Sequence, residues 1–194
     1  MNWIIYVLWG IIMVSLVIEI KYTKERLASL KRGFNALKFL PVALIILITA
    51  AIVAITAKDQ FPILNWGWLG TNIMMQPLVD IAETQTTTVG IGVDLVQIIT
   101  IILFMVAIAF ACLLCNFYEE ERFRSSLFAV VIWAFIHMLM GIPIYAVFPI
   151  FCVGLFYKYI YDKYSLDHSY CLHFFTNMSL VSVMGIVLII GEFV

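Results

Sequence analysis

Residues 98–126 read IITIILFMVAIAFACLLCNFYEEERFRSS, and this stretch decides how the chain folds. Its first part, 98–115, is apolar and approaches the roughly 20 residues that an α-helix needs to cross a bilayer. Three consecutive glutamates (119–121) and two arginines, Arg122 and Arg124, follow within a few residues. These charges mark either the point where the chain leaves the lipid or a set of ionisable groups held in the membrane layer.

The composition indicates an integral membrane protein. Of the 194 residues, 64% are hydrophobic and 12% are charged, and the mean hydropathy is +1.09. Soluble domains average about 45–50% apolar and about 25% charged residues, so lipid must be the solvent for much of this surface. The net charge of -1 argues against a broad basic surface for nucleic acid.

The distribution of apolar residues predicts an all-α fold, a polytopic membrane helical bundle with about six transmembrane helices. The chain forms a single integral membrane domain, residues 1–194, without internal repeats. Segment 58–92 is predicted to be interfacial or re-entrant, with a mobile part. The predicted spans are 2–20, 39–57, 93–118, 126–142, 143–161 and 170–191.

The basic residues predict the orientation of these spans, because cytoplasmic loops are enriched in Lys and Arg. Six of the eleven basic residues lie between positions 21 and 38. We therefore expect the 21–38 and 162–169 loops on the cytoplasmic side, and both termini, 58–92 and the GIP turn (141–143) outside. The expected location is a prokaryotic cell membrane, with the site open to the cytoplasmic side. Four cysteines lie in or beside apolar spans, namely Cys112, Cys115, Cys152 and Cys171. Cys112 and Cys115 form a C-x-x-C, which in a soluble protein can indicate a metal or redox site, but both lie in an apolar helix and are predicted to be buried structural thiols.

Polar residues occur at three places in or beside the apolar spans, and each has a simple structural explanation. The glutamates after 98–115 fit an interfacial loop. His137, in the apolar segment 131–143, fits a histidine bonded to a backbone carbonyl. His173 and Asn177 lie four residues apart and share one helical face, which fits a polar contact between two helices.

The expected depths of these residues agree with one another. If the third and fourth spans turn near 127–129, Glu119 and His137 each lie roughly nine residues, or about 13 Å, from the turn. If the last span begins near Asp167, His173 is about 9 Å and Asn177 about 15 Å along it. The sequence therefore predicts one polar layer below the cytoplasmic surface.

The spacing within the glutamates predicts different roles for them. Glu120 and Arg124 are four residues apart with the glutamate first, the favourable order for a helical ion pair. Glu119 points about 100° away from Glu120, so we expect its carboxylate to face a cavity. Glu121 and Arg122 are interpreted as ordinary interfacial charges, and His168 as a solvated loop residue.

These residues, taken in order, resemble the motifs of the CAAX-protease and bacteriocin-processing (CPBP) intramembrane proteases, which include the Ras-converting enzymes. That family carries E-E-x-x-x-R, then F-x-x-x-H, then H-x-x-x-N or H-x-x-x-D. The matching positions all lie within 119–177 and are Glu119, Glu120 and Arg124, then Trp133 and His137, then His173 and Asn177. Trp133 replaces the phenylalanine, and the 18 positions from Glu119 to His137 are fewer than expected for the family.

The resemblance implies a glutamate-dependent endopeptidase that needs no cofactor. It assigns water activation to Glu119 with His137 as its partner, and hydrogen-bond donation to the oxyanion to His173 and Asn177. Glu120 with Arg124, and Trp133, support the site. A zinc mechanism is the alternative, because two histidines and a glutamate are possible ligands. A non-catalytic immunity protein, scaffold or transporter is the alternative to an enzyme.

The expected partners are the lipid bilayer and a peptide or protein substrate at the membrane, without nucleic acid. A prenylated CAAX protein, a bacteriocin leader peptide and a membrane anchor all remain open as substrates. The oligomeric state is open as well.

Overall fold

The computed structural model describes residues 3–69 and 95–191, and every regular element in these residues is a helix. The 3₁₀ segments that join or extend the α-helices are Ile20–Tyr22, Phe34–Phe39, Pro62–Asn65 and His137–Met140. Most of segment 58–92 lies outside the described residues, so its predicted re-entrant character stays a prediction. The α-helices are α1 (Trp3–Glu19), α2 (Thr23–Gly33), α3 (Leu40–Gln60), α5 (Leu95–Phe123), α6 (Leu127–Ile136), α7 (Ile144–Lys163) and α8 (Leu166–Gly191).

Long apolar helices make this a multi-pass membrane protein and confirm the all-α prediction. Four stretches in the described residues are long and apolar enough to cross a membrane. They are Trp3–Gln60, Ile98–Phe123, Ile144–Lys163 and Leu166–Val187. The first contains both α1 and α3, and the helical segment Leu127–Met140 is shorter than the others. The count of six therefore requires α1 and α3 to be separate spans and Leu127–Met140 to be a short one.

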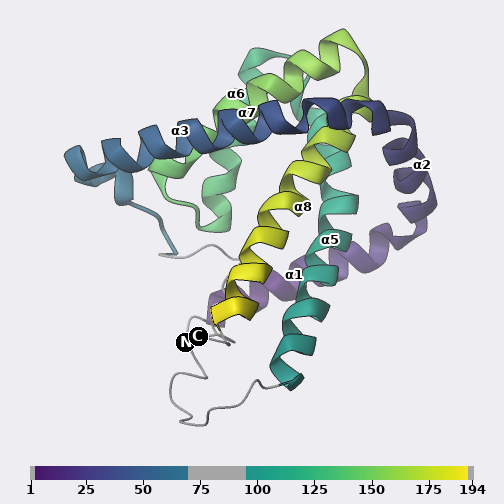
Figure 1. Ribbon diagram of the computed structural model, residues 1–194, viewed down its shortest axis with the longest axis horizontal. Coiled ribbons are helices and arrows are strands. Elements are labelled where there is room, and N and C mark those ends of the chain that lie inside the picture. The colour runs from purple at the N-terminus through teal and green to yellow at the C-terminus, as the bar shows by residue number, and fades with distance from the viewer. Residues whose placement is uncertain (1–2, 70–94, 192–194) are drawn as a thin grey trace.

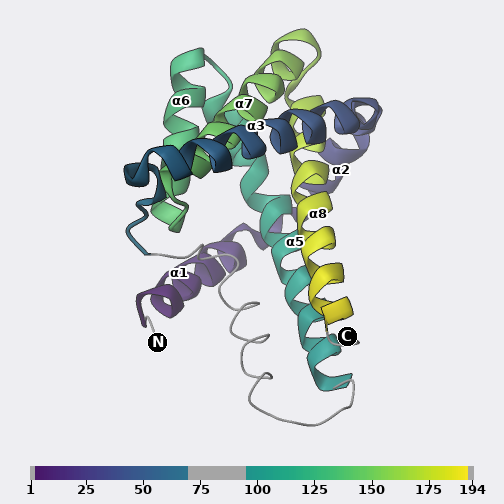
Figure 2. The same ribbon diagram turned by 60° about the vertical axis from the view of Figure 1, so that its left-hand side comes forward.

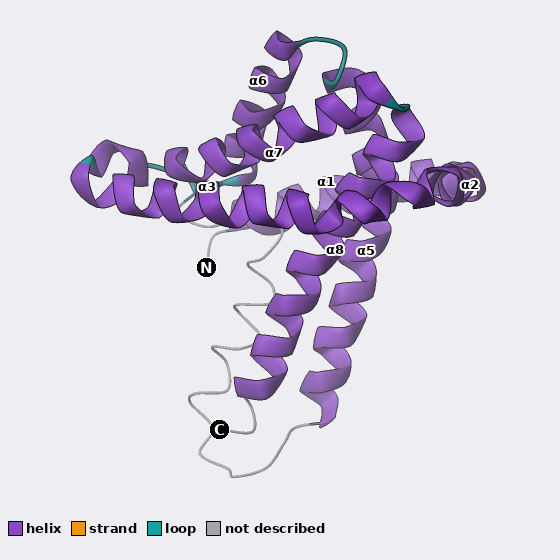
Figure 3. Ribbon diagram, turned by 45° about the horizontal axis from the view of Figure 1, so that its top comes forward, coloured by secondary structure: helices purple, strands orange, loops and turns teal. Residues whose placement is uncertain are grey.

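The helices form two packed sets that cross each other. Helices α5 and α8 run antiparallel and side by side (Figures 1 and 2), while α3 packs along α7, and α7 also contacts α6. Figure 3 shows α3 crossing the α5–α8 pair steeply. The core at the crossing contains Trp133 of α6, Tyr157 and Ile160 of α7, and Leu172 of α8.

Two sets of contacts join segments that lie far apart in the sequence. In the first, Arg32 and Ser29 of α2 both bond the carboxylate of Asp167 in the first turn of α8. In the second, the Ile144 amide donates to the Trp66 carbonyl over 3.1 Å, and Trp68 Nε1 donates to the Met138 carbonyl over 2.8 Å. The 21–38 and 162–169 segments, both predicted to be cytoplasmic, are thus in contact. Segment 58–92, predicted to be external, contacts residues that flank the GIP turn.

This pairing leads to a labelling prediction. In a variant without the four native cysteines, a membrane-impermeant maleimide added to intact cells should label Asn65→Cys and leave Ala28→Cys and Lys163→Cys unmodified. All three positions are exposed, so only the bilayer should determine which of them the reagent reaches. Labelling of Ala28→Cys from outside, with Asn65→Cys protected, would show that the protein has the opposite orientation.

The structure corrects three details of the sequence interpretation. The turn between the third and fourth spans lies at 124–126 rather than 127–129, because the Ser126 side chain caps α6 by accepting a hydrogen bond from the Ala129 amide. His168 lies in the first turn of α8, half-buried, with Nδ1 2.8 Å from Ser165 Oγ, and is not a solvated loop residue. Cys115 is exposed on α5 rather than buried. The predicted start of the last span near Asp167 is confirmed by α8.

Candidate functional site

Glu120 is the centre of a buried polar network. Its side chain and that of Arg124 are both fully buried. Arg124 donates to Glu120 through Nη2 over 2.7 Å and through Nε over 3.0 Å, so the predicted ion pair is present. Arg124 is the first residue after α5, four positions after Glu120, and burial on every side removes the water that normally weakens such a pair.

Helix α8 supplies the remaining partners of Glu120. His173 Nδ1 lies 2.9 Å from Glu120 Oε1, and the Ser169 hydroxyl donates to Glu120 Oε2. The His173 ring stacks on Tyr157 of α7, with centroids 4.7 Å apart. Arg124, His173 and Ser169 therefore occupy both oxygens of the Glu120 carboxylate.

Glu119 has a different environment from its neighbour. Its side chain is 28% exposed, and its carboxylate accepts a hydrogen bond from Trp133 Nε1 over 2.7 Å. His173 Nε2 lies 3.8 Å from the same Oε2 atom. Glu119 thus remains partly exposed, while Trp133 of α6 and His173 of α8 lie against its carboxylate.

The tryptophan at position 133 has a specific use here. The Cζ atom of the Arg124 guanidinium lies over the Trp133 ring, 4.0 Å from the ring centroid. Gly154 of α7 leaves room for this ring, because a Cβ atom at that position would lie only 2.6 Å from Trp133 Cζ3. A phenylalanine could make the ring contacts, but it has no N–H to donate to Glu119.

His137 sits beside this group at the start of the 3₁₀ segment. Its Nδ1 lies 2.8 Å from the Trp133 carbonyl, so Nδ1 carries the hydrogen because a carbonyl can only accept. Its ring meets the Trp133 indole edge-on at 4.7 Å. The backbone bond anticipated for a structural histidine is present, and it leaves Nε2 uncommitted.

Asn177 belongs to a second polar contact, one turn along α8 from His173. Its Nδ2 lies 3.4 Å from Asn116 Oδ1 of α5. Asn116 is 3% exposed, and its Nδ2 has no hydrogen-bond partner among the described residues. The α5–α8 contact is therefore polar over two successive turns, from Glu120 to Asn116.

Sequence reasoning missed three residues of this site: Asn116, Tyr157 and Ser169. Two of them carry a usable signal, since Asn116 precedes Glu120 by four residues and Ser169 precedes His173 by four, so each pair shares a helical face. Tyr157 has no such signal, because it comes from α7 and reaches His173 only through the crossing of the helices.

No three His, Cys, Asp or Glu side chains within 3–69 and 95–191 converge in an arrangement that could hold a metal ion. The zinc alternative named Glu119, His137 and His173 as ligands, and the Nδ1 atoms of both histidines are already bonded to protein oxygens. Any metal would have to bind through their Nε2 atoms.

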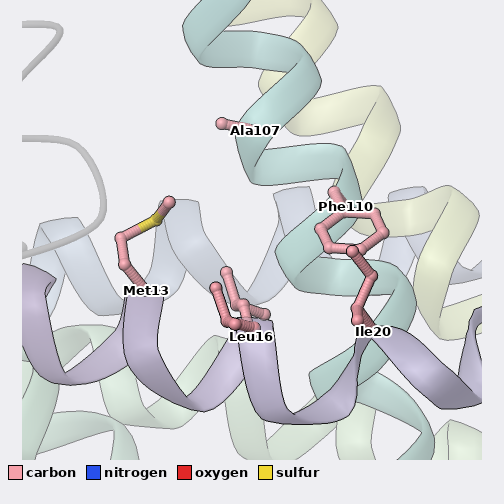
Figure 4. A pocket seen from close by; sticks show the side chains of 6 residues that line it. Met13, Leu16, Ile20, Ala107 and Phe110 are labelled. Carbon is pink, nitrogen blue, oxygen red and sulfur yellow. The ribbon is translucent and has the colours of Figure 1, made fainter.

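An apolar groove lies away from the polar network, between α1 and α5 (Figure 4). It is lined only by apolar side chains, those of Met13, Leu16, Val17, Ile20, Ala107 and Phe110. Phe110 precedes Glu119 by nine residues, which places it on the opposite side of α5. The groove therefore contributes nothing to the site around the glutamates.

No family model, curated protein or solved structure matches this chain.

Proposed function

We propose that the protein is an intramembrane endopeptidase that hydrolyses a peptide bond of a membrane-associated substrate with a water molecule activated by Glu119. One observation carries the proposal, namely the contrast between two adjacent carboxylates. Glu120 is fully buried with both oxygens bonded, whereas Glu119 is partly exposed and accepts one hydrogen bond from Trp133. The resemblance of the three motifs to the CPBP proteases points to the same chemistry.

The contrast assigns different roles to the glutamates. A general base must lie within hydrogen-bond reach of the proton that it removes. Glu120 has no free oxygen to offer and is closed off by α8, so it serves to hold His173. Glu119 has a free oxygen and an accessible side chain, so it is the base.

The reaction then follows ordinary peptide hydrolysis. Glu119 takes a proton from water as the water oxygen attacks the carbonyl carbon, and the carbonyl oxygen becomes an oxyanion. The carbon–nitrogen bond breaks when this intermediate collapses, and the proton held by Glu119 passes to the departing amine. We assign His137 the role of assisting this proton transfer, because its Nδ1 is bonded to the Trp133 carbonyl and its Nε2 has no hydrogen-bond partner among the described residues.

Donors to the oxyanion come from α8 and its contact with α5. His173 donates from Nε2 when that nitrogen carries a proton. Asn177 donates from Nδ2 to Asn116 Oδ1 over 3.4 Å, and an amide NH₂ group carries two hydrogens. The second hydrogen of the Asn177 amide is the proposed donor to the developing negative charge.

The membrane position completes the proposal. Counting α1, α3 and Leu127–Met140 as separate spans gives six crossings, which requires strongly tilted spans because α3 crosses the α5–α8 pair steeply. The glutamates then lie close to the end that carries the basic α2 segment. By the positive-inside rule this end is cytoplasmic, so the substrate enters from the cytoplasmic side. A prokaryotic cell membrane is the expected location.

Cleavage by the purified protein tests the proposal. Protein reconstituted in liposomes should cut at least one peptide in a panel of prenylated CAAX peptides, leader peptides and single-span membrane peptides, as judged by mass spectrometry of both fragments. Because Glu119 activates the water, activity should persist in excess chelator.

Two results would contradict the proposal in different ways. Activity that disappears with chelator and returns with zinc would move Glu119, His137 and His173 to the role of metal ligands. Absence of cleavage across the panel, with a cellular phenotype that survives Glu119→Gln, would favour a binding protein in which the network only joins helices.

A further inference from the structure

Helix α2 has an exposed face that is suited to the surface of a membrane. The opposite face is buried against α5 and α8 through Arg26, Ser29, Leu30 and Gly33. The Arg26 guanidinium lies 3.6 Å from the centroid of the Phe117 ring of α5. This helix is therefore fixed to the protein on one side and open on the other.

The open face carries two lines of side chains. Leu27 of α2 and Phe34, the first residue after this helix, are 52% and 58% exposed and lie seven residues apart, close to two helical turns. Lys24 and Lys31 of α2 have the same spacing, Lys38 lies in the 3₁₀ segment that follows α2, and all three are exposed. An apolar line beside a basic line is the arrangement of a helix that lies in the membrane interface.

The orientation of α2 agrees with that position. Figure 3 looks along α2, which is seen end-on, whereas α3, α5 and α8 extend across the same view. Since α2 is steeply inclined to all three of these long apolar helices, it runs across the membrane rather than through it. Its open face can then lie at the level of the lipid headgroups.

The charges on this face are not neutralised within the protein. Arg32 pairs with Asp167 at 2.5 Å, and Glu25 lies 3.6 Å from Arg26. No carboxylate among the described residues forms a salt bridge with Lys24, Lys31 or Lys38; Lys38 lies only over the rings of Phe39 and Tyr164. Three lysines thus remain available to an external anion.

We infer that the 20–39 segment is a binding surface for anionic phospholipids, with the lysines on the headgroup phosphates and Leu27 and Phe34 in the acyl boundary. This inference is independent of the proposed enzymatic function. Basic residues at a membrane surface attract acidic lipids, each by roughly fivefold in affinity. Three lysines together correspond to a preference on the order of 100-fold over zwitterionic lipid.

The surface is joined directly to the polar network. Asp167 accepts hydrogen bonds from Arg32 and Ser29 and lies two residues before Ser169 in α8. Gly33 packs against the Asp167 backbone, where a Cβ atom at position 33 would approach the Asp167 carbonyl oxygen to 2.0 Å. Lipid bound on α2 would therefore also hold the turn of α8 that places Ser169 and His173.

Lipid retention tests the inference. The protein is reconstituted in nanodiscs with equal amounts of phosphatidylglycerol and phosphatidylcholine, transferred to detergent, and the bound phospholipids are counted by native mass spectrometry. The wild-type protein should retain phosphatidylglycerol preferentially. The triple variant Lys24→Gln, Lys31→Gln, Lys38→Gln should lose this preference, and the corresponding Lys→Arg triple variant should keep it.

A matched control removes the same charge elsewhere. Arg122→Gln with Lys58→Gln and Lys163→Gln should leave the preference unchanged. For the unmodified protein, about 0.5 M NaCl during reconstitution should reduce the preference, because salt screens exposed charges. The inference is wrong if the Lys→Gln variant retains phosphatidylglycerol like the wild type, if the control triple loses it equally, or if salt has no effect.

Discussion

Replacement of Glu119 by glutamine is expected to lower the rate of peptide cleavage by about 10²- to 10⁴-fold, the usual contribution of a general base. Glutamine keeps the shape of the side chain and an oxygen that can accept from Trp133 Nε1. It cannot take a proton from water. Folding should survive, because a neutral side chain is easier to hold in a poorly solvated position than a charged one.

Turnover of a trial peptide in liposomes, measured beside the thermal stability of the same preparation, provides the test. Glu121→Gln is the matched control, since Glu121 is the next residue, is exposed and should tolerate the change with full activity. If Glu119→Gln cleaves as fast as the wild type while a stably folded Glu120→Gln is inactive, the roles of the two glutamates are reversed.

The second large effect is on stability. Glu120→Gln is expected to lower the free energy of unfolding by about 3–5 kcal/mol, the cost of removing one partner from a buried ion pair. The loss has a clear origin, because Arg124 is fully buried and would keep its charge without a carboxylate. Arg124→Met should be comparably harmful, since Glu120 would then be the unpaired charge.

Unfolding in mixed micelles with increasing SDS measures this effect, and two comparisons make it specific. The double variant Glu120→Leu, Arg124→Met should recover part of the loss, because no unpaired charge remains. Asp162→Asn breaks the Lys158–Asp162 pair, which has the same i,i+4 spacing, but Asp162 is 55% exposed. It should change stability by about 1 kcal/mol or less. Equal losses for Glu120→Gln and Asp162→Asn would show that burial does not strengthen the inner pair.

Local spacing explains what the sequence predicted correctly. The Glu120–Arg124 pair depends only on helical periodicity, and the start of α8 follows from where the apolar pattern resumes. The split between Glu119 and Glu120 also follows from the angle between adjacent helical residues. None of these requires knowledge of how helices cross.

Contacts between helices explain what the sequence did not reveal. The bond from Trp133 to Glu119 depends on how α6 crosses α5 and on the space left by Gly154 of α7. Asn116 contacts Asn177 only because α5 and α8 run antiparallel in one register. A sequence pattern identifies faces of helices, but it does not specify which faces meet or at what angle.

The position of Arg124 limits where residues can be inserted into this chain or deleted from it. Arg124 belongs to the turn 124–126, yet its guanidinium is inserted between Glu120 of α5 and the Trp133 ring of α6, and its carbonyl accepts a hydrogen bond from Lys158 of α7. The connection is thus part of the interior. A residue inserted in the turn 124–126 would move the guanidinium away from Glu120 or from the Trp133 ring. Insertions and deletions should therefore be tolerated less well in this turn than in other connections. The short interval between Glu119 and His137 is then a length that the protein cannot readily alter.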